Sequence, residues 1–365
     1  MSLELEERLV AKANQAKIPL TVNFELTPIC NLGCDMCFIR TEKSVVDKLG
    51  GLHTVDEWLE IAREFKKLGT LFILLTGGEP MLYPGFKELY PELKKMGFIL
   101  TINTNGTMID EEMAQLLHAY TPRRVNVTLY GPDRDYYQRL THHADGFDRC
   151  MRGLKLLRQY NIDTKMNISL VKSNDGTHQR LLEIAQELDI PAVTNSYMFP
   201  CMRSNCAGKR HIVEERLDPI KAAEEAVVYM KYKKGEEFPL YAREAVRSIA
   251  YVEPRPVGLD CRAASSSGWV NWQQLLSPCV MMEAPRLNLH QIPVAEAWKR
   301  LVEESLTLPK HEECADCKLR LLCEVCYAGA CHEKKMCGNL DYLCQMAHKK
   351  VELLEQETTE HEENS

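Results

Sequence analysis

The chain has 365 residues, 45% of them hydrophobic, so it can bury a sizeable core, and its length favours one large domain with a smaller one. A formal net charge of -7 gives no general attraction to nucleic acid or to anionic membranes, and no apolar run approaches the roughly 18 residues of a membrane span. Because the N-terminus also lacks the layout of a signal peptide, we expect a cytoplasmic protein whose 15 cysteines bind metal rather than form disulfides.

Strand and helix patterns alternate over the first 200 or so residues. The segment Leu20–Thr27 alternates in polarity and is rich in β-branched residues, which predicts a strand. A helix is predicted over about Val55–Leu68, and the next strand over Thr70–Leu75. Later strands are predicted near residues 98–102, 124–129, 164–171 and 192–197, with helices between them such as 147–160 and 177–188.

Six strand–helix units indicate an α/β fold with a parallel sheet and right-handed crossovers. Because about 200 residues are too few for eight units, we expect a partial (β/α)6, TIM-like barrel over residues 1–212. The charged, helix-rich stretch 213–255 is predicted to be a helical bridge. The acidic end, 351–365, is predicted to be a fraying helix and a solvated tail.

A cysteine loop follows the first predicted strand. In PICNLGCDMCF, Cys30, Cys34 and Cys37 have the spacing C-x3-C-x2-C. Three thiolates can hold three corners of a [4Fe-4S] cluster and leave the fourth iron open to another ligand. A zinc knuckle or free thiols are the alternatives, but zinc sites favour C-x2-C pairs matched by a second pair nearby.

With this motif the chain resembles the radical S-adenosylmethionine (SAM) superfamily. The resemblance implies that the open iron binds the amino and carboxylate groups of SAM, and that one electron then releases methionine and a 5'-deoxyadenosyl radical. An aromatic residue is usual before the third cysteine, where this chain has Met36. The departure is mild, because that position packs near adenine and does not bind iron.

Further SAM contacts are implied at the ends of later strands. By resemblance, the second strand ends in the GGEP motif that holds the SAM amino group, formed by Gly77, Gly78, Glu79 and Pro80. Asn105 follows the third strand, and Thr128 matches a position near the SAM ribose on the fourth. Asn167 and Ser169 on the fifth strand are also predicted to face SAM, since α/β barrels keep their sites at the carboxyl ends of strands. Each polar residue could instead cap a helix or close a turn.

A second group of cysteines lies between residues 256 and 350. Cys261 and Cys279 flank an alternating segment that predicts a hairpin, and CADCKLRLLCEVC follows. This region resembles the SPASM domain of radical SAM peptide maturases, which holds two auxiliary [4Fe-4S] clusters. The resemblance implies that the ligands of the distal cluster are Cys314, Cys317, Cys323 and Cys344, and that those of the proximal cluster are Cys261, Cys279 and Cys326.

The proximal set is one ligand short. Cys331 could complete it, or its fourth iron could be open, and two zinc ions remain an alternative for these thiols. No role is assigned to Cys337 or to Cys150, the latter expected to be a buried structural thiol. Cys201 and Cys206 could contact substrate or be free loop thiols, and His142 and His143 are expected in a solvated loop rather than as ligands.

Two-cluster enzymes of this kind commonly crosslink ribosomally made peptides. The resemblance therefore implies a peptide substrate and a reductant such as flavodoxin or ferredoxin, with no nucleic acid or membrane partner. Sulfatase-maturase relatives place an aspartate after the cysteine that corresponds to Cys279, and Val280 stands there in this chain, which argues against that activity.

Two other classes of function stay open. One is a radical SAM dehydrogenase of a small molecule, or a protein oxidation like that of the sulfatase maturases. The other is a non-catalytic iron–sulfur protein that carries electrons. This second class predicts four thiolates at every cluster and no SAM site, which the open three-cysteine motif followed by GGEP disfavours.

Overall fold

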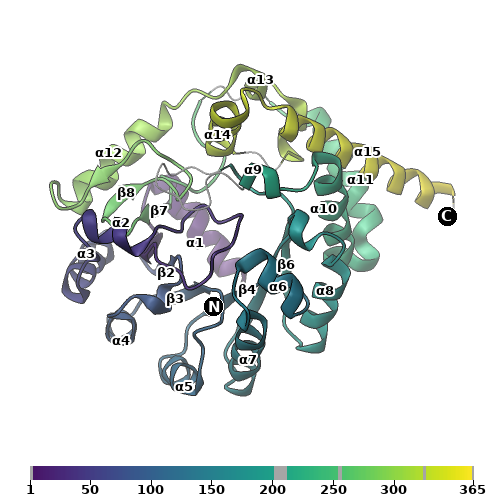
Figure 1. Cartoon of the computed structure of the whole chain (residues 1–365). Coiled ribbons are helices and arrows are strands. Elements are labelled where there is room, and N and C mark those ends of the chain that lie inside the picture. The colour runs from purple at the N-terminus through teal and green to yellow at the C-terminus, as the bar shows by residue number, and fades with distance from the viewer. Residues whose placement is uncertain (1–2, 201–211, 254–256, 324–325, 364–365) are drawn as a thin grey trace.

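The computed structural model describes residues 3–200, 212–253, 257–323 and 326–363. Its centre is a curved sheet whose convex side is covered by helices (Figure 1). The first six strands are parallel and lie in sequential order, which confirms the predicted partial barrel. These strands are β1 Thr21–Thr27, β2 Phe72–Gly77, β3 Ile99–Thr104, β4 Arg124–Leu129, β5 Thr164–Ser169 and β6 Ala192–Asn195.

Helices connect successive strands of the barrel. Each of these crossovers packs on the outside of the sheet, as the parallel order requires. The helices of this part are α1 Leu3–Ala16, α2 Lys43–Lys48, α3 Val55–Lys67, α4 Phe86–Lys95, α5 Glu111–Ala119, α6 Arg134–Thr141, α7 Gly146–Gln159 and α8 His178–Glu187.

The two faces of the barrel strands differ in polarity. On β4, Val125 and Val127 point outward and are fully buried, whereas Asn126 and Thr128 alternate with them and are half-buried. The outward apolar face packs on helices, and the fully buried Trp58 of α3 lies 5.0 Å from the Phe24 ring of β1. Burying one such side chain contributes about 1.5–3 kcal/mol, so the alternation holds the helices on the sheet.

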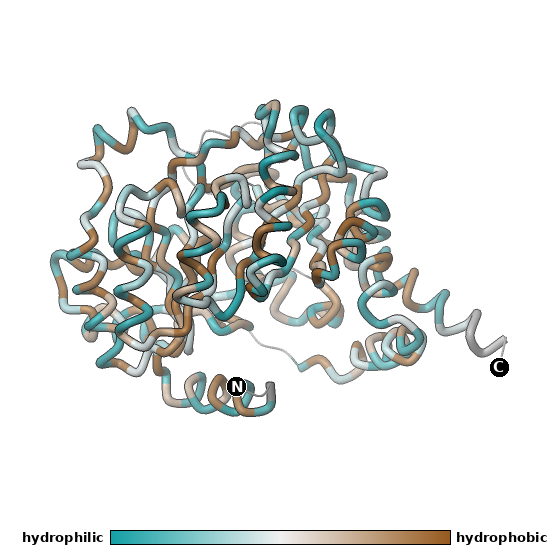
Figure 2. The backbone as a smooth tube through the Cα atoms, turned by 90° about the horizontal axis from the view of Figure 1, so that it is seen from below, coloured by the Kyte–Doolittle hydropathy of each residue, from teal (hydrophilic) through white to brown (hydrophobic). Residues whose placement is uncertain are grey.

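Helix α1 covers one end of the barrel. It lies behind the ring of strands in Figure 1 and along one side of the molecule in Figure 2. Its Leu9 and Val10 pack with Phe72 and Ile99, at the starts of β2 and β3. This contact closes the end of the barrel opposite the carboxyl ends of the strands.

Part of the cysteine-rich region belongs to the same sheet. Strand β7 (Ser267–Val270) pairs parallel with β1 and forms the predicted hairpin with β8 (Leu275–Ser277), which β9 (Leu287–Asn288) extends. The sheet order is therefore β6-β5-β4-β3-β2-β1-β7-β8-β9. A wall of the barrel thus comes from sequence some 245 residues beyond β1.

The C-terminal helix α15 (Asp341–Glu363) packs against two helices that follow the barrel. Helices α10 and α11 pack against α15, where Leu354 is fully buried and Val351 and Leu353 join it. The chain beyond residue 351 continues as a helix as far as Glu363, in line with the predicted helix, and its packing against α10 and α11 includes Leu354. These helices are α9 Ile212–Glu215, α10 Pro219–Lys234, α11 Phe238–Ser248, α12 Val294–Leu306, α13 Glu312–Ala315, α14 Tyr327–Cys337 and α15 Asp341–Glu363.

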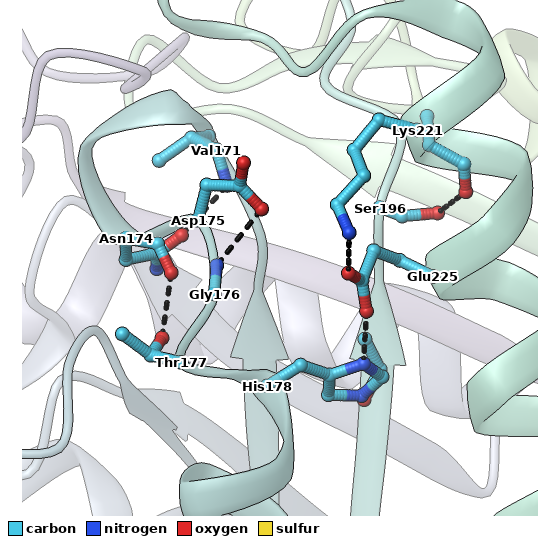
Figure 3. A network of polar contacts seen from close by, with 11 residues as sticks. Val171, Asn174, Asp175, Gly176, Thr177, His178, Ser196, Lys221 and Glu225 are labelled. Atoms are coloured by element: carbon cyan, nitrogen blue, oxygen red, sulfur yellow. Dashed lines mark hydrogen bonds and ion pairs between the residues drawn. The ribbon is translucent and has the colours of Figure 1, made fainter.

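A polar network ties α10 to the barrel (Figure 3). His178 at the start of α8 contacts Glu225 of α10 through Nδ1 at 2.6 Å and Thr194 of β6 through Nε2 at 2.9 Å. Lys221 pairs with the same carboxylate at 2.8 Å. The network fixes the first bridge helix against the last barrel strand. None of the helices in the described ranges is long and apolar enough to cross a membrane.

Candidate active site

The three cysteines of the first motif lie in the loop that leaves β1. Cys30, Cys34 and Cys37 all line one cavity of about 230 Å³ at the carboxyl ends of the strands. The same cavity is lined by Gly77 and Gly78 from the end of β2. Asn105, Thr128, Tyr130, Ser169 and Met198 contribute further walls.

The protein environment disfavours the ionised form of the Cys30 and Cys34 thiols. Burial raises the pKa of the Cys30 thiol to about 12, and the charge of Glu79 adds to that rise. Burial also raises the pKa of Cys34 well above its usual range, with repulsion from Cys37 and Cys30 as the next causes. Because coordination to a metal deprotonates a thiol outright, the three cysteines around this cavity fit an iron–sulfur cluster.

Hydrogen bonds to sulfur hold the loop in place. Leu32 N donates to Cys30 Sγ at 3.4 Å, and Arg40 N donates to Cys37 Sγ at 3.3 Å. Asn105 Nδ2 lies 3.6 Å from Cys30 Sγ and 3.0 Å from Asn31 Oδ1. Donors to sulfur of this kind tune the potential of a cluster, so Asn105 contacts the cysteine loop in addition to lining the cavity.

The two glycines after β2 let that strand end meet the cysteine loop. A Cβ on Gly77 would lie 2.2 Å from Thr27 O, and one on Gly78 would lie 2.5 Å from Ile29 O. In their place, Gly78 N donates to Thr27 O at 2.8 Å and Glu79 N donates to Ile29 O at 2.9 Å. The glycines therefore let the backbone after β2 approach the backbone of the cysteine loop closely.

Glu79 lies beneath the cavity wall. Its fully buried carboxylate accepts hydrogen bonds from Thr104 Oγ1 at 2.9 Å, Asn105 N at 2.8 Å and Met81 N at 3.2 Å. Burial raises the pKa of Glu79 to about 7. Neither Glu79 nor Pro80 lines the cavity, and the carboxylate of Glu79 joins the ends of β2 and β3.

Asn167 also stands away from the cavity, half-buried on β5 two residues before Ser169, which does line it. The sequence reasoning missed Asn31, whose Nδ2 donates to Thr107 Oγ1 at 2.8 Å, and Met198, a cavity residue after β6. Asn31 lies next to the first cysteine, which was a usable signal. Nothing local marks Met198.

Comparisons with known proteins agree with this geometry. Residues 24–185 match the model of the radical SAM superfamily. These residues are a radical SAM domain. The superfamily uses a [4Fe-4S] cluster and SAM, and the residues around the cavity suit both.

Among curated proteins, the chain is 22% identical to an AdoMet-dependent heme synthase of Methanosarcina barkeri, over 86% of this chain and 92% of that one. It is 27% identical to the sporulation killing factor maturation protein SkfB of Bacillus subtilis, over 43% of this chain and 37% of SkfB. Two solved structures share the fold. Streptococcus suis SuiB bound to precursor peptide SuiA has a TM-score of 0.64 and 19% identity, with 91% of this chain and 78% of that one covered. Native anSMEcpe with bound AdoMet has a TM-score of 0.65 and 20% identity, with 95% and 100% covered.

Beyond the radical SAM domain, the second group of cysteines gathers around two cavities. Both cavities are bordered by Cys323 and are lined by the two sets that the resemblance implied. A cavity of about 440 Å³ is lined by Cys261, Cys279, Cys323 and Cys326, and a smaller one of about 60 Å³ by Cys314, Cys317, Cys323 and Cys344.

The other candidate residues lie apart from these cavities. Cys331 lines neither, and its thiol contacts Tyr327 on the same helix. Cys337 Sγ lies 3.6 Å from Arg216 Nη2. Cys150 is fully buried, as expected of a structural thiol. His142 Nε2 contacts Asp35 of the cysteine loop at 2.8 Å, and Cys201 and Cys206 lie outside the described residues.

One short segment after β6 touches both regions. Met198 lines the cavity of the radical SAM domain, and the next residue, Phe199, packs against the small buried cluster of Met281, Met282 and Ala328, against which Cys279 and Cys326 also pack. A Cβ on Gly329 would lie 3.2 Å from this ring. Consecutive residues of this segment thus touch the radical SAM cavity and a cluster whose Met282 and Ala328 line the larger auxiliary cavity.

Proposed function

We propose that this radical SAM domain works with two auxiliary [4Fe-4S] clusters to oxidise, and crosslink, a ribosomally made peptide. The observation that carries the proposal is that two consecutive residues touch both regions: Met198 lines the radical SAM cavity, and Phe199 packs on the cluster that borders the larger cysteine-lined cavity. An oxidation needs an electron acceptor beside the substrate, and a peptide needs an open approach; the sheet is not closed into a full barrel, since β6 and β9 are its two edge strands.

The residues divide the work. Cys30, Cys34 and Cys37 would hold one cluster, and Gly77 and Gly78 would present backbone to SAM. When bound, the cluster and SAM together supply a radical that removes one hydrogen atom from the substrate. The substrate then loses a proton and one electron as its new bond forms, and the cysteines of the second group would hold the acceptor of that electron. The overall change is the loss of two hydrogens, and a flavodoxin or ferredoxin would supply and collect electrons.

Relatives support this choice in part. SkfB is a maturation protein and SuiB was solved with a precursor peptide, although each is a distant relative. Val280, after Cys279, differs from the aspartate of the sulfatase maturases, which favours crosslinking over that oxidation.

A tetrapyrrole substrate is the second candidate. The curated heme synthases match this chain along most of its length and theirs, whereas the match to SkfB covers less than half of either chain. Such a substrate would also be oxidised, so the same cysteines would serve.

The first test concerns cluster chemistry. Anaerobically reconstituted protein should hold about twelve irons, since three cubanes need four each. The Cys30→Ala, Cys34→Ala, Cys37→Ala triple variant should lose about four irons and all 5'-deoxyadenosine production, whereas Cys314→Ala with Cys317→Ala should lose about four irons and keep some SAM cleavage. A wild type that never exceeds about four irons and carries stoichiometric zinc would contradict the auxiliary clusters.

Substrate class is tested by mass. With SAM, a strong reductant and the small peptide encoded beside this gene, the product should be lighter by two hydrogens. Changing Cys261 or Cys279 to Ala should stop that product and leave some SAM cleavage. Turnover of a tetrapyrrole in place of the peptide would select the second candidate.

A further inference from the structure

The inner face of the barrel carries polar side chains below the radical SAM cavity. Ser169 and Thr128 line that cavity, and side chains two or four residues earlier on the same strands share their face. On β5 this face includes Lys165, and on β4 it includes Asn126. The outward residues Met166 and Val127 between them are fully buried against helices.

The strand register places these residues side by side. Asn103 pairs with Asn126, and Asn126 pairs with Lys165, on three adjacent strands. Asn126 Nδ2 donates to Asn103 Oδ1 at 2.7 Å, which shows that both amides are on the inner face. Asn103 also lines the radical SAM cavity, so this row, Asn103–Asn126–Lys165, borders that cavity at its Asn103 end.

Such a row is unusual for the inside of a barrel. Interior layers are normally packed with branched apolar residues, and a polar group shielded from water normally has a partner. Asn126 Oδ1 is shielded from solvent and has no hydrogen-bond partner among the described residues. As whole residues, Asn103, Asn126 and Lys165 are each half-buried.

The charge of the row is also unbalanced. Lys165 is half-buried, and no carboxylate in the described part of the chain lies within ion-pair distance of its ammonium. Arg124, one step nearer the closed end on β4, is already paired with Asp163 at 2.9 Å, and Glu6 of α1 is paired with Arg123 at 2.6 Å. Burial, and then the charge of Arg124, lower the pKa of Lys165, so a nearby anion would stabilise its charged form.

We propose that Lys165, with the amides of Asn103 and Asn126, is a subsite that binds a carboxylate of the substrate. The site rests on the proposed function, since it would receive the substrate of that reaction. Lys165 would contact the carboxylate, Asn103 would donate an amide N–H to it from the cavity, and Asn126 would hold Asn103 in place through their hydrogen bond. The carboxylate could belong to an acidic residue of a peptide or to a propionate of a tetrapyrrole.

A binding measurement tests the subsite without turnover. Reconstituted full-length protein with SAM is dialysed against two pools of capped pentapeptides that differ only in a central Glu or Gln, and against protoporphyrin IX or its dimethyl ester. We expect one of the two acidic probes to bind about tenfold to a hundredfold more tightly than its neutral counterpart, the effect of a charge-assisted contact. Lys165→Met should abolish that preference, and Lys165→Arg should restore most of it.

The matched control is Lys155→Met, an exposed lysine on the outer helix α7, which should keep the full preference. Iron content reports whether Lys165→Met is folded. The Glu pool as the preferred probe would assign the carboxylate to a peptide, and protoporphyrin would assign it to a tetrapyrrole. Equal binding of acidic and neutral probes, or a preference that survives Lys165→Met, would overturn the subsite. A product lighter by two hydrogens that still formed in that case would leave the proposed function standing.

Discussion

The carboxylate of Glu79 joins three donors from two strand ends, Thr104 Oγ1, Asn105 N and Met81 N. In the Glu79→Ala variant these buried donors lose their acceptor, and each unsatisfied donor costs about 1–3 kcal/mol. Relief from burying a charge offsets part of that loss, because the pKa of Glu79 is raised to about 7. We therefore expect a net loss of roughly 2–4 kcal/mol in the free energy of unfolding by urea. Glu88→Ala, at an exposed site on α4, should change it by less than about 0.5 kcal/mol, and an equal effect of both changes would contradict the role of Glu79.

At the scale of elements, the contact of α8 with α10 depends on pH. The pKa of the buried Glu225 carboxyl is lowered, chiefly by its hydrogen bond with His178. The hydrogen bond from Lys221 lowers it further, against the opposing effect of burial. A carboxylate whose pKa is lowered by folding stabilises the fold above its unfolded pKa, and this contribution is lost as the pH falls through the folded pKa. Glu225→Gln should therefore lower the free energy of unfolding at about pH 7, and the difference from wild type should shrink below about pH 4. Urea unfolding at both pH values measures this, and a gap that widened on acidification would refute it.

At the scale of the whole molecule, a buried ion pair joins the segment after the barrel to the cysteine-rich region. Arg216 of the segment after α9 pairs with Glu333 of α14 at 2.5 Å, and Tyr197, after β6, donates to the same oxygen at 2.7 Å. Removing one member of a buried pair leaves an uncompensated charge and costs about 3–5 kcal/mol. Arg216→Met should lose that much in urea unfolding, and adding Glu333→Gln should recover part of it. A double variant as unstable as Arg216→Met, or more so, would show that the charge of Glu333 is not the cause.

The sequence by itself determined the elements and the first metal motif. Alternating polarity and β-branched residues predicted the ends of all six barrel strands to within about three residues. The reason is that residues facing the helices are apolar and residues facing the barrel interior are more polar, so polarity alternates along each strand. The spacing of Cys30, Cys34 and Cys37 predicted their common cavity, since all three lie in one short loop. Local chemistry was enough in both cases.

Only the tertiary structure decided how distant segments meet. Three features join residues too far apart in sequence to leave a local pattern: the pairing of β7 with β1, the burial of Leu354, and the packing of Phe199 against the cluster that contains Met282. The hydrogen bonds of Glu79 leave no local pattern for the same reason: its donors Thr104 and Asn105 come from the next strand, and a buried carboxylate needs partners wherever they lie. The inner row that ends at Lys165 likewise emerges only from the register of three strands, because each of its residues taken alone has the pattern of an ordinary strand position.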